Sequence, residues 1–519
     1  MTPLLTMGQT LSVNAFRHPD KVGAHDLGRS MSFRVWNQRS CRLANALRGL
    51  GLAKGDRIAV LAYNCVEWME IYAATAKAGL IAVPINFRLT DEEMLYIIGD
   101  SAAKALIFQD ELQANVARIR DRLPIPGANL IHFGAHVGVK SAPVGFTGYE
   151  DLLATATDTE PDTQVTPEDT WVMMYTSGTT GRPKGAMRSH GSHSLLNFAT
   201  LLDMGFDGGH TCLLVMPMCH ANSLNLASAF AYAGATCCVY DRKSFDPEHM
   251  LATFAQTKAT FTSLVPTHYI MMLGLSDAVK ARHSVASVRK LMISSAPARR
   301  DTKLAVMEQF RNSQLLELYG STEQGWATLL QPSEQLSKLG SVGRELTGSG
   351  RIKLLDENGV EVPEGEVGEL YSRTPWCFEG YWNLPEKTAE AFRGAWLSVG
   401  DMARRDPDGF YTLVDRKNNM IISGGENVYP SEVENVLGGH PKVRDVAVIG
   451  RPDAKWGEAV HAVVVLRDGE TATEADLSEW CTARLAGFKR PKTFSFIADA
   501  EMPRTATGKV LHRVLKSRS

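Results

Sequence analysis

The chain has 519 residues, 44% of them hydrophobic and 22% charged, which is typical of a globular protein. At roughly 150 residues per domain, this length predicts about three or four compact units instead of one hydrophobic core. The formal charge of −2 (57 acidic against 55 basic residues) excludes a global field that would attract nucleic acid or anionic lipid.

The sequence also bears on where the protein resides. No apolar run reaches the roughly 18 residues of a transmembrane segment, and residues 1–7 lack the features of a signal peptide. The eight cysteines have no C-x-x-C spacing, so we expect reduced thiols in a cytoplasmic protein. The oligomeric state stays open, a homodimer included.

Residues 42–108 alternate between helical and strand-like patterns. Helices are predicted at 42–50 and 68–77, each closed by a glycine, and strands at 56–62, 81–86 and 105–108. This βαβα order is typical of a parallel sheet covered by helices.

A loop rich in glycine and hydroxyl groups follows the next predicted strand, Trp171–Met174. Residues 175–185 contain three glycines, four serines or threonines, an arginine and Lys184. Such a loop presents backbone N–H groups to phosphate, and Lys184 adds a positive charge. It is not a Walker A motif, because Arg182 and Pro183 separate Gly181 from Lys184. The alternative is a flexible surface turn.

A second strand series follows between residues 211 and 318, with strands predicted at 211–216, 236–240, 260–265, 290–294 and 315–318. From about 340 the segments become short and rich in glycine, which predicts a small antiparallel barrel at about 340–415. Residues beyond the charged turn 416–419 have a separate α+β pattern.

The expected fold is therefore α/β and multidomain. Residues 1–415 would form a large body of two doubly wound β/α subdomains plus the barrel. Residues 416–419 would be a hinge, and residues 420–519 a small α+β domain.

The loop at 175–185 is one of five motifs that occur in a fixed order. The others are Tyr319–Glu323, Gly400–Asp401, Asp415–Pro430 and Pro503–Lys509. In this order they closely resemble the adenylate-forming superfamily of acyl-CoA synthetases, adenylation domains and luciferases. The resemblance spans about Phe16 to Lys516.

The resemblance implies a reaction in two steps. A carboxylic acid attacks the α-phosphorus of ATP to give an acyl-adenylate and pyrophosphate, and a thiol, usually that of coenzyme A, then displaces AMP. Both first reactants are anionic, so the site must neutralise charge before they meet. Lys509 would bridge them, with Mg²⁺ as the second counterion, and the C-terminal domain would be mobile between the steps.

The resemblance also assigns roles to residues. Catalysis would involve Lys509, Thr322, Glu323 and His220, and Thr176 and Glu323 would lie near Mg²⁺. The phosphate loop would be Thr176, Ser177, Gly178, Thr179, Thr180, Gly181 and Lys184. The adenine and ribose would contact Ser295, Ala296, Pro297, Tyr319, Gly320, Asp401 and Arg416. Coenzyme A would contact Gly424, Gly425, Arg451 and Lys489. Asn418 stands at the hinge position, where the family usually has Asp or Lys.

The resemblance implies an acyl pocket that is lined mostly by apolar or small residues. Its candidate residues are His220, Ala221, Ser223, Leu224, Gly325 and Trp326. His220 would stand at the mouth, or else be a satisfied core histidine. No lysine or arginine occurs in the pocket segments 216–226 and 319–328, which disfavours a dicarboxylate. If Trp326 faces the pocket, it shortens the tunnel and favours a medium-chain fatty, alicyclic or aryl acid. If Trp326 packs into the sheet instead of facing the pocket, a longer chain is allowed.

Several alternatives share these motifs. A long-chain fatty-acid–CoA ligase, a stand-alone adenylation enzyme that loads a carrier protein, and a luciferase-like oxygenase all begin with the same step. A nucleotide-binding protein without catalysis would be expected to lack Lys509 or Glu323, and both are present. The sequence favours a free-standing acid–CoA ligase.

Overall fold

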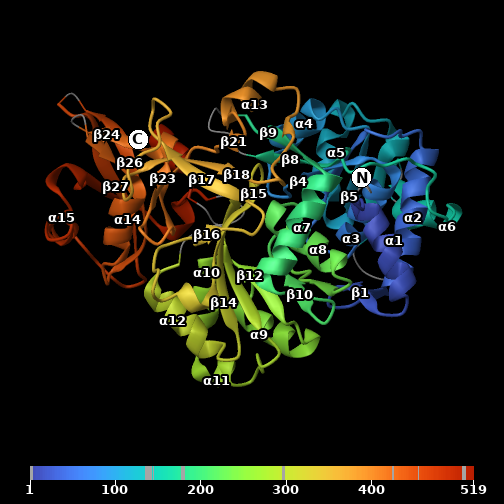
Figure 1. Cartoon of the computed structure of the whole chain (residues 1–519), viewed down its shortest axis with the longest axis horizontal. Helices are drawn as coiled ribbons and strands as arrows, with labels where there is room; N and C mark the ends of the chain where they lie inside the picture. Colours follow the sequence, from blue (N-terminus) through green and yellow to red (C-terminus); the bar gives the residue numbers. More distant parts are fainter. Residues whose placement is uncertain are drawn as a thin grey trace. The chain divides into compact units, whose positions relative to one another are not determined.

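The computed structural model describes residues 4–134, 143, 145–176, 182–294, 298–423, 426–453, 455–504 and 510–518 (Figure 1). The chain divides into two compact units. Unit 1 comprises Met1–Leu339, Gly343–Arg351 and Ser372–Leu397, and unit 2 comprises Gly340–Val342, Ile352–Tyr371 and Ser398–Ser519.

The first sheet of unit 1 contains the strands predicted in the N-terminal part of the chain. Its strand order is β19 (Gly380–Tyr381), β9 (Lys184–Ser189), β8 (Thr170–Thr176), β4 (Ile81–Ile85), β3 (Arg57–Leu61), β5 (Ala105–Gln109), β6 (Leu130–Phe133) and β7 (Thr147–Gly148). The pairs from β8 to β7 are parallel, whereas β8, β9 and β19 pair antiparallel.

The second sheet of unit 1 is built in the same way. Its strand order is β16 (Arg344–Glu345), β15 (Gly325–Leu330), β14 (Gln314–Ser321), β13 (Lys290–Ser294), β12 (Phe261–Leu264), β10 (Thr211–Leu214), β11 (Thr236–Val239), β1 (Val22–His25) and β2 (Ser30–Ser32). The strands from β14 to β1 run parallel, and antiparallel strands complete both edges. The contribution of β1 and β2 was not predicted.

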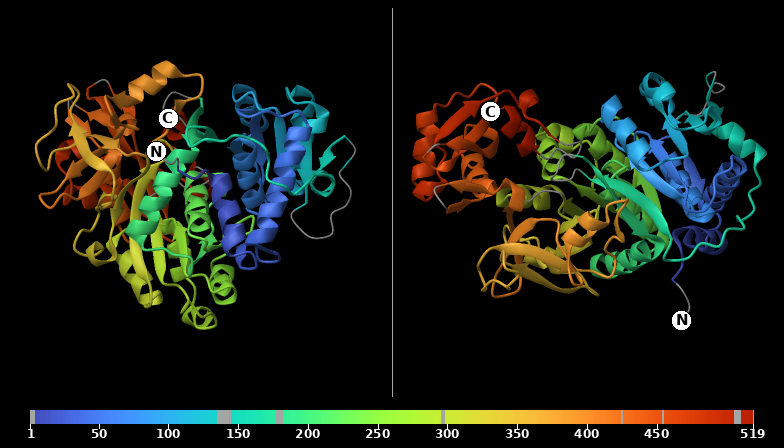
Figure 2. Two further views of the ribbon diagram at one scale, coloured as in Figure 1. Left: turned by 45° about the vertical axis from the view of Figure 1, so that its right-hand side comes forward. Right: turned by 90° about the horizontal axis from the view of Figure 1, so that it is seen from above.

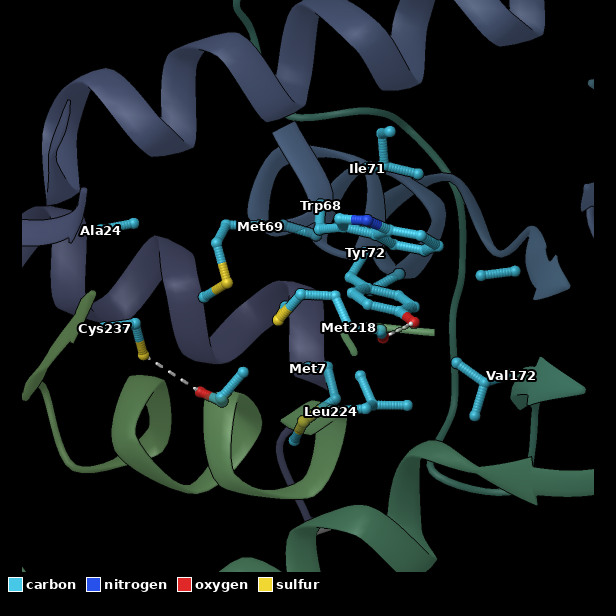
Figure 3. Close-up of a cluster of buried hydrophobic side chains, with 14 of the residues drawn as sticks. Met7, Ala24, Trp68, Met69, Ile71, Tyr72, Val172, Met218, Leu224 and Cys237 are labelled. Carbon is cyan, nitrogen blue, oxygen red and sulfur yellow. Dashed lines mark hydrogen bonds between the residues drawn. The ribbon is translucent and has the colours of Figure 1, made fainter. Parts of the chain in front are cut away.

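A central hydrophobic cluster joins side chains from both sheets and the helices that cover them. The helices are α1 (Met7–Arg17), α2 (Phe33–Gly49), α3 (Glu67–Ala78), α7 (His190–Met204) and α8 (Ala221–Tyr232). Figure 3 shows Trp68 and Tyr72 of α3 near Leu224 of α8 and Val172 of β8. The Tyr72 hydroxyl donates to the Met218 carbonyl at 2.8 Å, so the polar group of this buried tyrosine is satisfied.

Separate hydrophobic clusters lie between each of the two sheets and the helices on its outer face. Figure 2 shows the ribbon of these helices and strands from two further sides. The first sheet packs against α4 (Asp91–Asp100) and α5 (Gln113–Ile119), and the second against α9 (Pro247–Thr257), α10 (Pro266–Leu273) and α12 (Arg300–Gln309). Helices on both faces of mostly parallel sheets confirm the prediction of two doubly wound β/α subdomains.

The predicted barrel at about 340–415 is wrong. In unit 1, β16 and β19 extend the edges of the two large sheets, so they are not available to close a barrel. In unit 2, the described residues form an open antiparallel arrangement in which β18 (Gly368–Arg373) pairs with β22 (Asp401–Arg405), and β22 with β23 (Tyr411–Arg416).

The C-terminal part of unit 2 has the predicted α+β fold. Its sheet has the order β25 (Glu426–Val428), β24 (Ile421–Ser423), β27 (Gly457–Leu466) and β26 (Val443–Asp453), with β28 (Thr493–Phe496) also paired to β27. Val446 and Val448 pack into one cluster and Ala447 and Ile449 into another, as expected where successive side chains of a strand alternate between faces. The helices are α14 (Pro430–Gly438), α15 (Glu474–Thr482) and α16 (His512–Arg518). The boundary at 416–419 stays a prediction.

None of the helices in the described part of the chain is long and apolar enough to cross a bilayer.

Candidate active site

A tight hairpin between β14 and β15 presents Thr322 and Glu323 at its tip. Ser321 pairs with Gly325, and the Ser321 hydroxyl accepts from the Gln324 N–H at 3.0 Å. Gly325 has φ +68°, and a Cβ at Gly320 would lie 2.1 Å from the Gly325 carbonyl oxygen. Only glycine fits both positions without strain, which explains the glycines around Thr322 and Glu323.

The Glu323 carboxylate is buried, with 7% of the residue exposed, and two hydroxyl groups donate to the same oxygen. Thr176, at the end of β8, lies 3.1 Å from Glu323 Oε1, and the Tyr381 hydroxyl lies 2.9 Å from it. The structure thus brings together the two residues that were predicted to lie near Mg²⁺. Tyr381 comes from β19 and was not predicted.

Lys184 lies against the ring of Tyr381. Its ammonium nitrogen is 3.9 Å from the centroid of that ring, a cation–π distance. Burial lowers the Lys184 pKa from its ordinary value, and the negative charge of Glu323 opposes that shift. A partly desolvated ammonium without a close carboxylate partner among the described residues is suited to bind a phosphate.

A buried arginine fixes the backbone next to Glu323. Arg188 of β9 donates to the Thr322 carbonyl and to the Trp376 carbonyl, both at 2.9 Å, and the Phe378 N–H donates to the Glu323 carbonyl at 2.8 Å. Burial lowers the Arg188 pKa. Sequence reasoning missed Arg188, although a charged residue within a buried strand is itself an unusual signal.

Two other predicted nucleotide contacts in unit 1 lie on the same hairpin. Tyr319 is buried in β14, and Gly320 follows it. Their proposed partners Ser295, Ala296 and Pro297 lie outside the described residues. The same is true of Ser177, Gly178, Thr179, Thr180 and Gly181 of the phosphate loop, of Gly424 and Gly425, and of Lys509.

His220 precedes α8 and has a buried ring nitrogen, Nε2, without a hydrogen-bond partner among the described residues. Burial, reinforced by the positive charge of Arg88, lowers its pKa to about 4. The His220 ring is therefore neutral at pH 7. Both alternatives for His220, a residue at the pocket mouth and a core histidine, stay open. Arg88, whose positive charge acts on His220, was not predicted because it lies far from the pocket segments 216–226 and 319–328 in the sequence.

The candidate pocket residues differ in what they contact. The Ser223 hydroxyl donates to the Met216 carbonyl at 2.6 Å, and Leu224 packs in the central cluster (Figure 3). Trp326 is 4% exposed, and its indole N–H donates to the Thr200 hydroxyl at 3.0 Å. Trp326 is thus anchored between β15 and α7, and whether it shortens the acyl pocket stays a prediction. Ala221 is partly buried and follows His220 in the chain.

A polar network that was not predicted lies close to His220 in the sequence. The Asn222 amide donates to the hydroxyls of Ser263 and Ser294 at 3.1 and 3.0 Å, while Asn222 Oδ1 is buried without a partner in the described part of the chain. Ser263 and Ser294 lie at the carboxyl ends of β12 and β13, the edge at which α/β sheets bind their ligands.

In unit 2, the predicted ribose-binding pair forms across two strands. Asp401 of β22 lies directly opposite Arg416 of β23, and Arg416 Nε is 3.1 Å from Asp401 Oδ1. An acceptor carboxylate beside a planar donor suits the two hydroxyls of a ribose. The neighbouring Lys417 pairs with Glu369 at 2.9 Å.

The predicted hinge position lies just after this pair. Asn418 is exposed, in a short 3₁₀ turn at Lys417–Asn419. The Asp415 carboxylate accepts from the Arg416 N–H at 2.6 Å, the Asn419 amide at 3.1 Å and the Ser431 N–H at 2.9 Å. Asp415 therefore fixes both ends of this turn, while the Asn418 side chain is left in solvent.

The two predicted coenzyme A contacts also lie in unit 2. Arg451 of β26 has a buried Nε without a partner among the described residues. Lys489 pairs with Glu432 at 2.7 Å, so binding a phosphate would require this pair to open.

Among the described residues, no group of three or more His, Cys, Asp or Glu side chains could hold a metal ion. One carboxylate and one hydroxyl, Glu323 and Thr176, nevertheless fit Mg²⁺, which prefers oxygen ligands and is commonly bound through one or two carboxylates together with substrate phosphates.

Comparison with known proteins agrees with this geometry. Residues 11–382 match the AMP-binding enzyme family, and residues 432–509 match the C-terminal domain of the same enzymes. The chain is 35% identical over 502 residues to feruloyl-CoA synthase of Amycolatopsis sp, covering 96% of each. It is 34% identical to the fatty acid–[acyl-carrier-protein] ligase ScoC of Streptomyces coeruleorubidus, covering 99% of this chain and 96% of that protein.

A solved structure has the same fold. It is the O-succinylbenzoate coenzyme A synthetase of Bacillus subtilis in complex with ATP and a magnesium ion. The TM-score is 0.85 with 27% identity, covering 98% of this chain and 99% of that one. The chain therefore belongs to the AMP-binding enzyme family.

Proposed function

We propose that the chain is an AMP-forming acid–thiol ligase that uses ATP, Mg²⁺ and coenzyme A. The observation that carries this proposal is the buried Glu323 carboxylate, held by Thr176 and Tyr381 beside the Lys184 ammonium. This arrangement places one fixed negative group and one partly desolvated cation where the phosphate loop begins and ends. It is suited to a nucleotide with its metal ion.

In the first step, a carboxylate oxygen of the acid attacks the α-phosphorus of ATP, and pyrophosphate leaves. Lys184 would bind the phosphates, and Lys509 would neutralise the repulsion between the two anions. Removal of one preorganised cation such as Lys509 should slow this step by about 10²–10³.

Glu323 and Thr176 would hold Mg²⁺, which offsets negative charge on the phosphates when it is bound. Thr322 would reach the α-phosphate from the hairpin tip. Because Gly320 and Gly325 keep the hairpin narrow, Thr322 and Glu323 are held in place before the substrate arrives.

In the second step, the thiol of coenzyme A attacks the acyl carbon and AMP leaves. Asp401 and Arg416 would hold the ribose, Tyr319 would contact the adenine, and Arg451 and Lys489 would bind phosphates of coenzyme A. A rotation of residues 420–519 about Asn418 would exchange Lys509 for the Gly424–Gly425 segment.

The acid is proposed to be a hydrophobic monocarboxylate. Feruloyl and fatty acyl groups appear in the names of its relatives, so both an aryl acid and a fatty acid are tested below. The Trp326 indole is held on Thr200, so its position in the pocket would set the length of the acyl chain that fits.

A second candidate function is loading of an acyl carrier protein, which the 34% identity to a carrier-protein ligase supports. Both candidates share the first step and differ only in the thiol that accepts the acyl group.

The test is AMP release with ATP and Mg²⁺, using ferulate and a C6–C16 fatty acid series. We expect release that depends on both an acid and coenzyme A. Release with a phosphopantetheinylated carrier protein but not with coenzyme A would select the second candidate. Release that needs no acid would refute both.

A further inference from the structure

Tyr381 contacts both charged groups of the candidate site, and no role has been assigned to it so far. Its hydroxyl donates to Glu323 Oε1 at 2.9 Å, and the centroid of its ring lies 3.9 Å from the Lys184 ammonium. Both contacts lie within unit 1.

The position of Tyr381 is itself strongly fixed. The residue is 7% exposed, and its strand β19 pairs with β9, with Tyr381 opposite Ala186. The Tyr381 N–H donates to the Thr388 hydroxyl at 2.9 Å, and the N–H of the following residue, Trp382, donates to the Gly185 carbonyl at 2.7 Å. The Tyr381 ring packs against Phe378, with centroids 4.8 Å apart.

The hydroxyl contact has a clear geometric consequence for the carboxylate. Thr176 and Tyr381 both donate to Oε1, and no described side chain donates to Oε2. Two donors on one oxygen fix the rotation of the carboxylate, so the other oxygen has a defined direction. A carboxylate that is fixed in advance binds a cation without losing rotational freedom at that moment.

The ring contact acts on the cation of the phosphate loop. Lys184 is partly desolvated, and its side chain is flexible. A carboxylate partner would hold the ammonium but would also cancel the positive charge that phosphate binding requires. The face of an aromatic ring holds the ammonium without cancelling this charge, and it leaves N–H groups of the ammonium able to bind phosphate.

We propose that Tyr381 is a positioning residue that orients the Glu323 carboxylate for Mg²⁺ through its hydroxyl and holds Lys184 for the phosphates through its ring. This inference rests on the proposed function, since it assumes that ATP and Mg²⁺ bind here. The hydroxyl and the ring of Tyr381 then have different roles, which substitutions can distinguish.

Two substitutions separate the contacts. Tyr381→Phe removes the hydroxyl and keeps the ring, whereas Tyr381→Leu removes both. The matched control is Tyr269→Phe, because Tyr269 is likewise a buried tyrosine of unit 1 but its hydroxyl donates to a backbone carbonyl, that of Met292, at 3.1 Å.

The primary measurement is ATP binding to the full chain by calorimetry, without acid or coenzyme A, over a series of Mg²⁺ concentrations. Tyr381→Phe should raise the Mg²⁺ concentration needed for half-maximal ATP binding about tenfold, the size of one hydrogen bond to a charged group. At saturating Mg²⁺ its ATP affinity should return to that of the unmodified protein. Tyr381→Leu should remain about fivefold weaker even there, because Lys184 has lost the ring. Tyr269→Phe should change neither quantity.

A double substitution distinguishes positioning from general stability. In a Glu323→Gln background, Tyr381→Phe should have no further effect on the Mg²⁺ dependence, since the group that it orients has lost its charge. If Tyr381→Phe acted only by destabilising the fold, its effect on ATP binding would instead add to that of Glu323→Gln.

The outcomes are separable. If the unmodified protein binds no ATP, the proposed function fails and this inference fails with it. If it binds ATP in a Mg²⁺-dependent manner and Tyr381→Phe leaves that dependence unchanged, or if raised Mg²⁺ does not restore binding, only this inference is overturned. Equal ATP affinity of the Phe and Leu variants at saturating Mg²⁺ would overturn the part assigned to the ring.

Discussion

The charged groups of unit 1 and unit 2 are held in different ways. In unit 1, Glu323 and Arg188 are buried, and their partners come from strands far away in the sequence. In unit 2, the pairs Asp401–Arg416 and Lys489–Glu432 each have a partly exposed cation, although Asp401 itself is buried, and the first pair joins neighbouring strands. Substitutions in unit 1 should therefore disturb the fold and the chemistry together, whereas those in unit 2 should mainly change ligand affinity.

The largest expected difference concerns two ion pairs. Lys303 and Glu317 form a pair in unit 1 with 0% and 3% of their side chains exposed, and burial raises the Glu317 pKa. Lys303→Met should lower the free energy of unfolding by about 3–5 kcal/mol, because it leaves a carboxylate buried without its partner. Lys489→Met in unit 2 should cost at most about 1 kcal/mol. Urea unfolding of both variants measures this, and equal losses would remove the distinction between the units.

The burial of His220 in unit 1 predicts how the stability of the protein depends on pH. Its pKa is about 4 in the folded chain, because of burial and then Arg88, against about 6.5 when unfolded. The unfolded chain therefore takes up this proton first, and stability is lost as the pH falls from 6.5 towards 4. Between pH 7 and pH 5 the unmodified protein should lose about 2 kcal/mol more than His220→Gln. Urea unfolding at both pH values measures this. An equal loss of unfolding free energy between pH 7 and pH 5 in the two proteins would contradict it.

A smaller effect is expected at the Asp401–Arg416 pair of unit 2, whose arginine is partly exposed. Asp401→Asn should weaken ATP binding about tenfold, the effect of losing one charged acceptor for a ribose hydroxyl, with little loss of stability. Glu369→Gln is the matched control, since Glu369 also binds a cation in unit 2, Lys417. ATP titration compares the two, and equal weakening would argue against a specific ribose contact.

The smallest effect is expected at Asn418. Asn418→Pro restricts the backbone at an exposed turn without removing a described side-chain contact. It should spare adenylate formation and slow thioester formation several-fold, as measured in single-turnover experiments with preformed adenylate. Equal slowing of both half-reactions would refute a role in rotation.

The same contrast explains what could be predicted from the sequence. The parallel strands at 56–108 and 211–318 were predictable because their apolar runs alternate with helical patterns. Asp401 and Arg416 were predictable from local motifs. The sequence alone did not exclude the barrel. Strands as short as β16 and β19 contain too few side chains to indicate which sheet they join.

The site in unit 1 could be predicted only in part. Thr176 and Glu323 lie within motifs, whereas Arg188 and Tyr381 contact Thr322 and Glu323 from segments far away in the sequence. Tyr381 meets Glu323 only because β19 extends the first sheet beside β9. No periodicity or composition in residues 372–397 indicates that pairing.

Acid-dependent ATP–pyrophosphate exchange in a matched pair of variants tests the central claim most directly. Glu323 and Glu379 are both carboxylates of unit 1 that accept hydrogen bonds, but Glu379 accepts from the Ser189 N–H at 2.8 Å, a bond that glutamine can keep. Glu323→Gln should lower exchange by about 10²–10³, and Glu379→Gln should leave it within a few-fold of the unmodified protein. Equal rates in the two variants, or exchange that does not require an acid, would contradict the account.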